Sequence, residues 1–273
     1  MSRVVALMVV CASRLTLAGP HDFVIETTGM GGTAEVAAPF VDQFLRHLET
    51  VLGWPEKSTA GQFFSDRAGT IGHIESAKPG IGMIEPDLWL DLHKKHALTV
   101  VASITGPRQA IGHLSVVVKD LKYKTLGDLK GQVLTSNHLE SPRFLSKIVF
   151  DGKLDAATFF KLQQTPSPLR GLKAVDRGEA AATLLDDMQT AQLQTLPFAS
   201  SLRVLYKSEV LPAVPVVAFG KNITPADRDQ IAQAMIGVCK SEKGAAVCKA
   251  LQIEAIVAPD KRIYDSAMRR YNK

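Results

Sequence analysis

The sequence lacks the features that mark several large classes of protein. It contains three cysteines in 273 residues, and no further soft or imidazole ligands stand near them in the sequence to make a metal site. No internal repeat and no low-complexity segment is present, which argues against solenoid arrays and disordered tails. The longest apolar run extends only from Val4 to Ala12, which is too short to span a bilayer.

Catalytic signatures are absent as well. There is no Gly-x-Ser-x-Gly elbow and no phosphate-binding P-loop, and no cysteine has the context of a nucleophile. His93 and His96 share one helical face, but no Glu-x-x-His partner exists, so we interpret them as part of a solvated face. Gly29-x-Gly31-x-x-Ala34 imitates a dinucleotide fingerprint without the acidic residue that would hold a ribose. The sequence therefore predicts no cofactor and no enzyme activity.

Neither sign of charge is in large excess. Lysine and arginine number 32 against 27 acidic residues, a net charge of +5, and the basic residues are scattered among acids. Nucleic-acid binding is therefore not expected. A basic cluster at the end of the chain, from Lys261 to Lys273, is interpreted as a solvated tail. The mild positive charge suits a protein that attracts small anions, but only weakly.

What is present begins at the amino terminus. Arg3 precedes the apolar run, and small residues follow at Thr16 and Ala18. This pattern is typical of a secretory signal peptide, here residues 1–18, and predicts a periplasmic protein. Bulky Val10 before Cys11 argues against lipid attachment. The alternative is that the run forms a buried first strand of a cytosolic domain.

Removal of a signal peptide would leave two cysteines, Cys239 and Cys248. The residues between them have a helix-end, turn, helix-start pattern, and this spacing can bring the two Cα atoms within disulfide range. We predict a disulfide, with two unrelated buried thiols as the alternative.

Strands and helices alternate along the chain, which predicts an α/β protein. An amphipathic helix carries Val36, Phe40 and Phe44 on one face and ends at Gly53. Crossovers are expected near Gly106 and near Leu211. They divide the chain into a first lobe, residues 20–106 and 213–273, and a second lobe, residues 107–212, with a ligand cleft between them. Such clefts form at the carboxyl ends of strands.

Several segments, in order, resemble one family. They are the helical Pro39–Leu45, the cleft-edge turn Glu85–Trp89, the second-lobe entry Lys124–Gly131, the strand Gly178–Asp186 and the return crossover Ser208–Pro215. Together they resemble the phosphate-, phosphite- and phosphonate-type periplasmic binding proteins of ABC importers, which have the type II periplasmic binding fold. This resemblance implies a solute receptor that closes its lobes on a small anionic, phosphonate- or phosphate-like ligand and delivers it to a membrane permease.

The candidate ligand contacts come from both expected lobes. Ser141 and Pro142 begin a helix whose free N–H groups favour an anion, and Arg143 could add a bidentate contact. The remaining candidates are the glycine-rich turn (Thr28, Gly29, Met30, Gly31), the cleft-edge residues Glu85 and Trp89, the loop residues Asn137 and His138, and the strand-end Asp186. The structural alternatives are a helix cap for Ser141, Glu85 and Asp186, a solvated side chain for Arg143, a core position for Trp89 and a plain tight turn for 28–31.

One feature departs from the family pattern. Phosphonate binders of this family carry a Ser-Thr-Ser-like run at this helix start. This chain instead has the sequence Asn-His-Leu-Glu-Ser-Pro-Arg at 137–143, in which only Ser141 matches. The acids near the cleft could accept from a protonated oxygen or bind an ammonium group, so a zwitterionic ligand remains possible. Two alternatives stay open: an enzyme on the same scaffold acting on a small metabolite, with His138 as the only candidate base, and a regulatory sensor domain, for which no helix-turn-helix is found.

Overall fold

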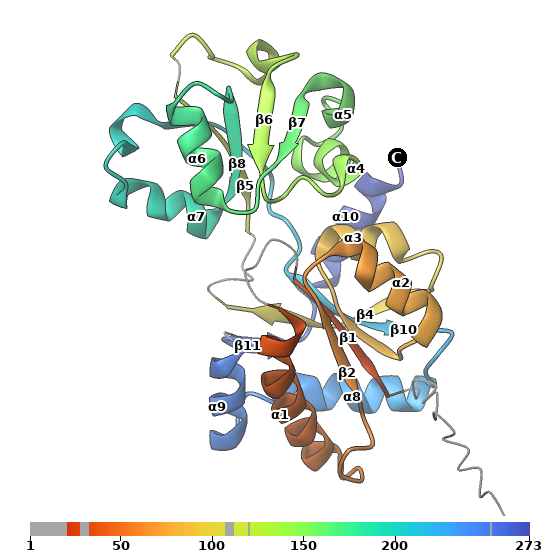
Figure 1. Ribbon diagram of the computed structural model, residues 1–273. Helices are drawn as coiled ribbons and strands as arrows, with labels where there is room; N and C mark the ends of the chain where they lie inside the picture. The colour runs from red at the N-terminus through yellow and green to blue at the C-terminus, as the bar shows by residue number, and fades with distance from the viewer. Residues whose placement is uncertain (1–20, 28–32, 107–111, 120, 252) are drawn as a thin grey trace, which may run out of the picture.

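The computed structural model describes residues 21–27, 33–106, 112–119, 121–251 and 253–273. It consists of two α/β lobes, each built on its own sheet (Figure 1). The predicted signal peptide (residues 1–18), Cys11 and the predicted glycine-rich turn 28–31 lie outside the described residues.

The first lobe contains a six-stranded sheet in the order β11-β4-β10-β3-β1-β2. Its elements are β1 (Phe23–Glu26), α1 (Ala34–Leu52), β2 (Gly61–Phe64), α2 (Arg67–Ala77), β3 (Ile81–Met83), α3 (Pro86–Leu92), β4 (Leu98–Thr105), β10 (Val214–Phe219), α8 (Pro225–Gly237), α9 (Glu242–Ala250), β11 (Ala255–Val257) and α10 (Lys261–Tyr271). β1 pairs in parallel with β2 and β3, and β10 is antiparallel to β3 and β4. Every residue of β10 is buried, as expected for a strand covered on both faces.

The second lobe contains a five-stranded sheet in the order β7-β6-β8-β5-β9. Its elements are β5 (Leu114–Val118), the 3₁₀ turn η1 (Leu126–Leu129), β6 (Val133–Ser136), α4 (Pro142–Phe144), the π-helical turn η2 (Leu145–Val149), α5 (Ala156–Phe159), β7 (Lys161–Gln164), α6 (Pro168–Asp176), β8 (Ala182–Asp186), α7 (Asp187–Gln192), the 3₁₀ turns η3 (Leu193–Thr195) and η4 (Ala199–Ser201), and β9 (Arg203–Lys207). β6 is parallel to β7 and β8, whereas β5 is antiparallel to its neighbours. The predicted α/β fold in two lobes is confirmed.

The amphipathic helix α1 is confirmed, with one difference along its apolar face. Gly53 ends it in the left-handed conformation at φ 68°, a backbone state that favours glycine. Phe44 and Leu48 are buried, but Phe40 is 42% exposed and Val36 is 63% exposed. Only the second half of the predicted apolar face therefore packs on the sheet.

The elements that were not anticipated include one helix beside the site and two strands. The residues expected to form a turn at Glu85–Trp89 instead begin the helix α3, which has a proline at its first position, where helices accept one. β7 was missed because its side chains are mostly polar and exposed, and β11 because it is only three residues long. Apolar periodicity gives little signal for short or polar edge strands.

The two lobes are connected by neighbouring segments. The Leu211 N–H donates to the Gly112 carbonyl at 2.9 Å, and the Ser208 N–H donates to the Leu114 carbonyl at 2.9 Å. The Ser208 hydroxyl also accepts from the Leu114 N–H. The outgoing and returning chains are thus hydrogen-bonded to each other between the sheets.

The carboxyl-terminal helix α10 lies between the lobes, against α3 of the first and η2 of the second (Figure 1). Arg270 pairs with Asp151 at 3.0 Å and donates to the Ile148 carbonyl at 2.5 Å. The Ile148 carbonyl is available because it lies in the last turn of η2, where the carbonyls have no partner further along the helix. The prediction of a solvated basic tail is therefore wrong for Arg270, although Arg269 is exposed.

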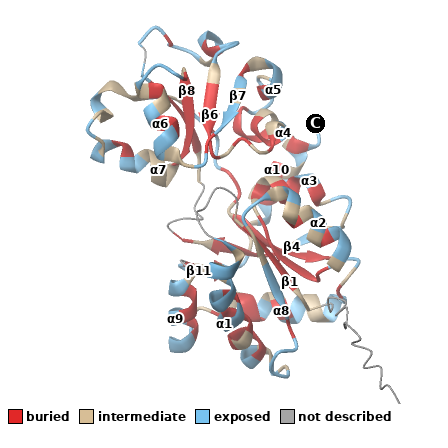
Figure 2. Cartoon of the chain, in the orientation of Figure 1, coloured by how far each residue is buried: buried red, intermediate tan, exposed pale blue. Residues whose placement is uncertain are grey.

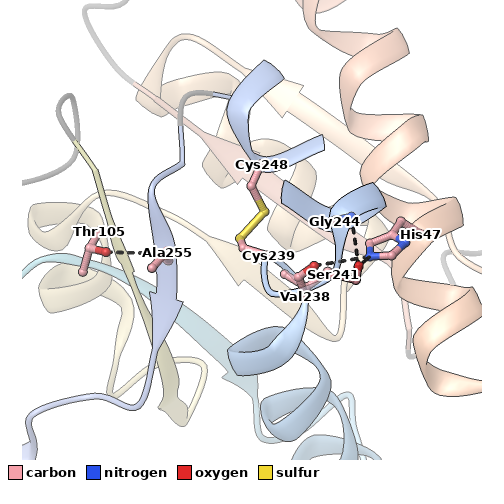
Figure 3. Close-up of a disulfide and its surroundings, with 8 residues drawn as sticks. All are labelled: His47, Thr105, Val238, Cys239, Ser241, Gly244, Cys248 and Ala255. Carbon is pink, nitrogen blue, oxygen red and sulfur yellow. Dashed lines mark hydrogen bonds between the residues drawn. A yellow bond between two sulfur atoms is a disulfide. The ribbon is translucent and has the colours of Figure 1, made fainter. Parts of the chain in front are cut away.

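The predicted disulfide is present: Cys239 is bonded to Cys248, with the Cα atoms 5.7 Å apart (Figure 3). Between them, the Ser241 hydroxyl caps α9 by accepting from the Gly244 N–H at 3.0 Å. A Cβ on Gly244 would lie 1.8 Å from the Val238 carbonyl oxygen, so this position requires glycine. Over the described ranges, no helix combines the length and the hydropathy needed to cross a membrane.

Candidate functional site

Each sheet has one point at which neighbouring parallel strands send their connections to opposite sides. In the first lobe this point lies between β1 and β3, and in the second between β6 and β8. Ligands of open α/β sheets bind at the carboxyl ends of strands beside such a switch point. The side chains found there are Glu26 and Glu85 in the first lobe, and Asn137, His138 and Asp186 in the second.

Glu26 is the last residue of β1 and is only 1% exposed. One carboxylate oxygen, Oε2, accepts from the Glu85 N–H at 3.0 Å. The other, Oε1, is buried and has no hydrogen-bond partner among the described residues. Glu85 stands at the N-cap of α3, but its side chain makes no capping hydrogen bond.

Burial and neighbouring acids both disfavour ionisation of this pair. Burial raises the pKa of Glu26 well above its ordinary value, and Asp87 and Glu85 raise it further. Burial also raises the pKa of Glu85 to about 8, with further contributions from Asp87, Glu140 and Asp186. Glu85 is therefore mainly protonated at neutral pH.

The arginine nearest to these acids is already paired. Arg67, the first residue of α2, contacts Asp87 at 2.6 Å and also contacts Asp91. Arg67 also lowers the pKa of Glu26, but this effect is smaller than those of burial, Asp87, Glu85 and the hydrogen bond from the Glu85 N–H. Among the described residues, the first-lobe side of the site therefore has more carboxyl groups than cations to balance them.

The second-lobe side is largely satisfied by its own contacts. His138 Nε2 lies 3.4 Å from Gln189 Oε1 and 3.8 Å from Asp186 Oδ2. Burial lowers the pKa of His138, although Asp186 and Gln189 oppose this shift. Asp186 also caps α7 by accepting from the Gln189 N–H at 2.7 Å. Asn137 is 5% exposed, and its side-chain oxygen has no partner in the described parts of the chain.

The two halves of the site lie within electrostatic range of one another. The pKa of Glu85, in the first lobe, is raised by Glu140 and Asp186, which both belong to the second. The fold thus brings together Glu85 and Asp186, two of the candidates expected from the sequence, with His138 against Asp186.

The structure places the other candidates elsewhere. Trp89 is 1% exposed and packs edge-on against Tyr264, at 5.3 Å between ring centroids. It is a core residue of the first lobe and not a wall of the site, as Figure 2 shows for the buried face of α3.

Ser141 and Arg143 belong to the contact between the lobes. The Ser141 hydroxyl caps α4 by accepting from the Phe144 N–H at 3.3 Å, and it hydrogen-bonds Asp91 of the first lobe. The Arg143 guanidinium lies over the Tyr271 ring, 4.5 Å from its centroid, and donates to the Tyr271 carbonyl at 3.1 Å. The Tyr271 hydroxyl in turn donates to Asp91. The carboxylate facing the start of α4 is therefore the protein's own Asp91.

Glu26, Arg67, Glu140 and Gln189 were not among the residues anticipated from the sequence, whereas Asp87 belongs to the cleft-edge segment 85–89. Glu26 could have been found, since it is a charged residue at the end of an otherwise apolar strand that precedes a helix. The others depend on which helices meet across the lobes. Among the residues that the structure describes, no group of three histidine, cysteine or acidic side chains is arranged to hold a metal ion.

Comparison with known proteins adds independent findings. Residues 33–264 match the family model described as "ABC transporter, phosphonate, periplasmic substrate-binding protein". None of the curated proteins matches the chain.

Solved structures share the fold at low sequence identity. A binding protein component of an ABC phosphonate transporter from Pseudomonas aeruginosa is 17% identical, covering 92% of this chain and 87% of its own, with a TM-score of 0.62. PhnD1 from Prochlorococcus marinus, in complex with methylphosphonate, is 13% identical over 93% of this chain and all (100%) of its own, with a TM-score of 0.62. A Xanthomonas citri protein bound to ATP is 12% identical over 92% of this chain and 97% of its own, with a TM-score of 0.70.

Proposed function

Because the chain belongs to the family of periplasmic substrate-binding proteins of ABC phosphonate transporters, we propose that it captures a small phosphonate-class solute between the two switch points. Members of this family are transport components and not enzymes, so the site has to bind its ligand and release it unchanged. Membership of this family also indicates that the protein works in the periplasm.

The observation that carries the proposal is the electrostatic coupling of Glu85 to Glu140 and Asp186. This coupling indicates that the strand ends of the two lobes lie near one another, which suits a ligand held by both lobes. Closure would bend the two connections between the lobes, near Gly106 and near Leu211, since hinges are short segments that absorb the backbone change.

The second lobe supplies the hydrogen bonds proposed for the oxyanion. Asn137 can donate from its amide nitrogen, and the neutral imidazole of His138 can donate from one ring nitrogen. Ser141 and Arg143 are assigned to the interlobe contact with Asp91 and Tyr271, so we no longer place them in direct contact with the ligand. The glycine-rich turn 28–31 stays a candidate from the sequence.

Three further parts of the proposal rest on the sequence and the family. Residues 1–18 act as the export signal. The lobes comprise residues 20–106 with 213–273 and residues 107–212, with α10 packed against both. The closed, liganded form delivers its solute to the membrane permease of an ABC importer.

Calorimetric titration of the mature protein with methylphosphonate, aminoalkylphosphonates and inorganic phosphate tests the proposal. We expect binding of at least one phosphonate, and an affinity loss of about tenfold in Asn137→Ala, because one hydrogen bond to a charged group is lost. Asn222→Ala is the matched control: Asn222 donates to the Pro79 carbonyl at 2.9 Å, on a turn of the first lobe, and its loss should leave affinity unchanged. Absence of binding by every phosphonate at millimolar concentration would contradict the proposed function.

A further inference from the structure

The carboxyl-terminal end of α10 joins one helix of each lobe. Tyr271, the last residue of α10, is only 1% exposed. Its hydroxyl donates to the Asp91 carboxylate of α3, in the first lobe. Its carbonyl accepts from the Arg143 guanidinium of α4, in the second lobe, at 3.1 Å, and this guanidinium lies 4.5 Å from the centroid of its ring. A single buried residue therefore bonds to both lobes.

The start of α10 is fixed inside the first lobe. The Tyr264 hydroxyl lies 2.7 Å from the Ser103 hydroxyl of β4 and donates to the Ala213 carbonyl at 3.0 Å. Ala213 lies where the chain returns from the second lobe. α10 is thus a rigid arm that is anchored beside this connection and extends to the second lobe (Figure 1).

Arg270 attaches the same end of the arm to η2 of the second lobe. It donates to the Ile148 carbonyl at 2.5 Å and pairs with Asp151 at 3.0 Å. Two consecutive residues of α10, Arg270 and Tyr271, therefore contact the second lobe. The arm adds a non-covalent link between the lobes to the two chain connections.

We propose that Tyr271 is a positioning residue for the ligand site: by holding α3 against α4, it aligns the strand ends of the two lobes before a ligand arrives. This inference rests on the proposed function, since the site that it aligns is the one proposed to capture the solute. It adds a residue of α10, which contributes no strand end, to those that set the affinity.

α3 and α4 both begin at residues of the candidate site. α3 starts directly after Glu85, and α4 follows the loop that carries Asn137 and His138. The Ser141 hydroxyl at the start of α4 hydrogen-bonds Asp91 near the end of α3. Rigid secondary elements and hydrogen bonds carry coupling between distant groups, so the contact at Asp91 fixes where Glu85 stands relative to the loop.

Asp91 is stabilised by groups of both lobes. Burial raises the pKa of its carboxyl, whereas Arg67 of the first lobe and Arg143 and Ser141 of the second lower it. Hydrogen bonds to ionised groups are among the stronger ones. Separation of the lobes at this point would remove the second-lobe share of this stabilisation, so Asp91 favours the joined arrangement before a ligand binds.

Prior alignment raises affinity, because the apparent affinity of a site falls in proportion to the fraction of molecules that are competent to bind. Without the Tyr271 contacts, the lobes should separate more widely in the unliganded protein. Ligand binding would then have to align them, which weakens it. Saturating ligand should restore the compact arrangement.

Two substitutions remove the Tyr271 contacts in steps. Tyr271→Ala deletes the ring and the hydroxyl, whereas Tyr271→Phe keeps the ring beside Arg143 and loses only the bond to Asp91. Calorimetric titration with methylphosphonate and 2-aminoethylphosphonate should show affinity falling about tenfold in Tyr271→Ala and about threefold in Tyr271→Phe, as if roughly a tenth and a third of the molecules were competent. Small-angle X-ray scattering of unliganded Tyr271→Ala should give a larger radius of gyration, which returns to the wild-type value with saturating ligand.

Tyr206 provides a matched control inside one lobe. It is a partly buried tyrosine of β9 whose hydroxyl donates to the Val149 carbonyl of η2 at 2.8 Å, and both residues belong to the second lobe. Tyr206→Ala should lower the thermal stability but leave the affinity and the radius of gyration unchanged.

The outcomes separate the two proposals. An unchanged radius of gyration in Tyr271→Ala, or an affinity loss that Tyr206→Ala reproduces, overturns the positioning role and leaves phosphonate binding intact. If Tyr271→Ala does not fold by circular dichroism, unchanged affinity in Tyr271→Phe overturns the positioning role instead. Failure of the wild-type protein to bind either phosphonate overturns the proposed function, whereas scattering of the unliganded variants still tests whether Tyr271 holds the lobes together.

Discussion

The two lobes place their site residues by the same topology but differ in how far the charged groups are paired. At the second-lobe switch point, His138 contacts Gln189 and Asp186, and Asp186 also caps α7, although the side-chain oxygen of Asn137 has no described partner. At the first-lobe switch point, Glu26 retains an orphan oxygen and Glu85 makes no side-chain hydrogen bond to a described residue. Parallel strand ends determine where a site can be, whereas the side chains there determine whether the half-site is complete without a ligand.

A second contrast concerns how each lobe is held. The first lobe is cross-linked by Cys239–Cys248 and contributes α10, whose Arg270 and Tyr271 reach the second lobe. The second lobe contributes a π-helical turn whose Ile148 carbonyl accepts from that helix. The interlobe contact therefore lies on α10 and α4, separate from the acids of the ligand site.

Among the substitutions that test this comparison, Trp89→Ala should have the largest effect, a loss of stability. The side chain is 1% exposed in the first-lobe core, so its removal should cost about 3–5 kcal/mol of unfolding free energy. Chemical denaturation measures this loss. If Trp89 lined the ligand site instead, the variant would lose affinity with little loss of stability, and titration at a matched folded fraction would show it.

Replacing Glu85 by glutamine should change how stability depends on pH. The pKa of Glu85 is raised in the folded protein to about 8 from an ordinary value of 4.5, so between those values the folded state binds more protons than the unfolded state. Its contribution to stability is full below pH 4.5 and is lost as the pH rises toward 8, with a slope of up to about 1.4 kcal/mol per pH unit. Denaturation at pH 5, 6 and 7 should give a shallower decline in Glu85→Gln than in the wild-type protein. Parallel declines would show that Glu85 is ionised in the unliganded protein.

Replacing Arg143 by alanine should have the smallest effect. Its stacking on Tyr271 and its bond to the Tyr271 carbonyl contribute about 1 kcal/mol at an exposed position, and phosphonate affinity should change less than threefold. Thermal denaturation and titration measure the two quantities. A large loss of affinity with unchanged stability would return Arg143 to the ligand site, and Lys147→Ala on the neighbouring turn serves as the control.

Much of the fold could be predicted because its signals are local. Buried strands such as β10 appear as continuous apolar runs, Gly53 ends α1, and Thr224 caps α8 by accepting from the Asp227 N–H, as expected from Thr-Pro at a helix start. The cysteine spacing similarly predicted the disulfide. Short or polar strands such as β7 and β11 carry no such signal.

The site was only partly predictable. Asp186 was found because it ends a strand, Glu85 because it follows one, and Asn137 and His138 because they precede a predicted helix. Ser141 and Arg143 matched a helix start equally well, but α10 and Asp91 occupy that position. Nothing in the local sequence shows that Tyr271, 128 positions from Arg143, would stack on it.

By itself, the sequence determined the alternation of strands and helices, the two-lobed α/β organisation, the disulfide and the family resemblance, because each of these depends on neighbouring residues or on motif order. Only the tertiary structure decided which polar groups face each other between the lobes. Charge interactions depend on distance and burial, and both are set by packing between segments far apart in the chain. For that reason the acidic character of the first-lobe half-site, with Glu26 at its centre, became visible only in the folded molecule.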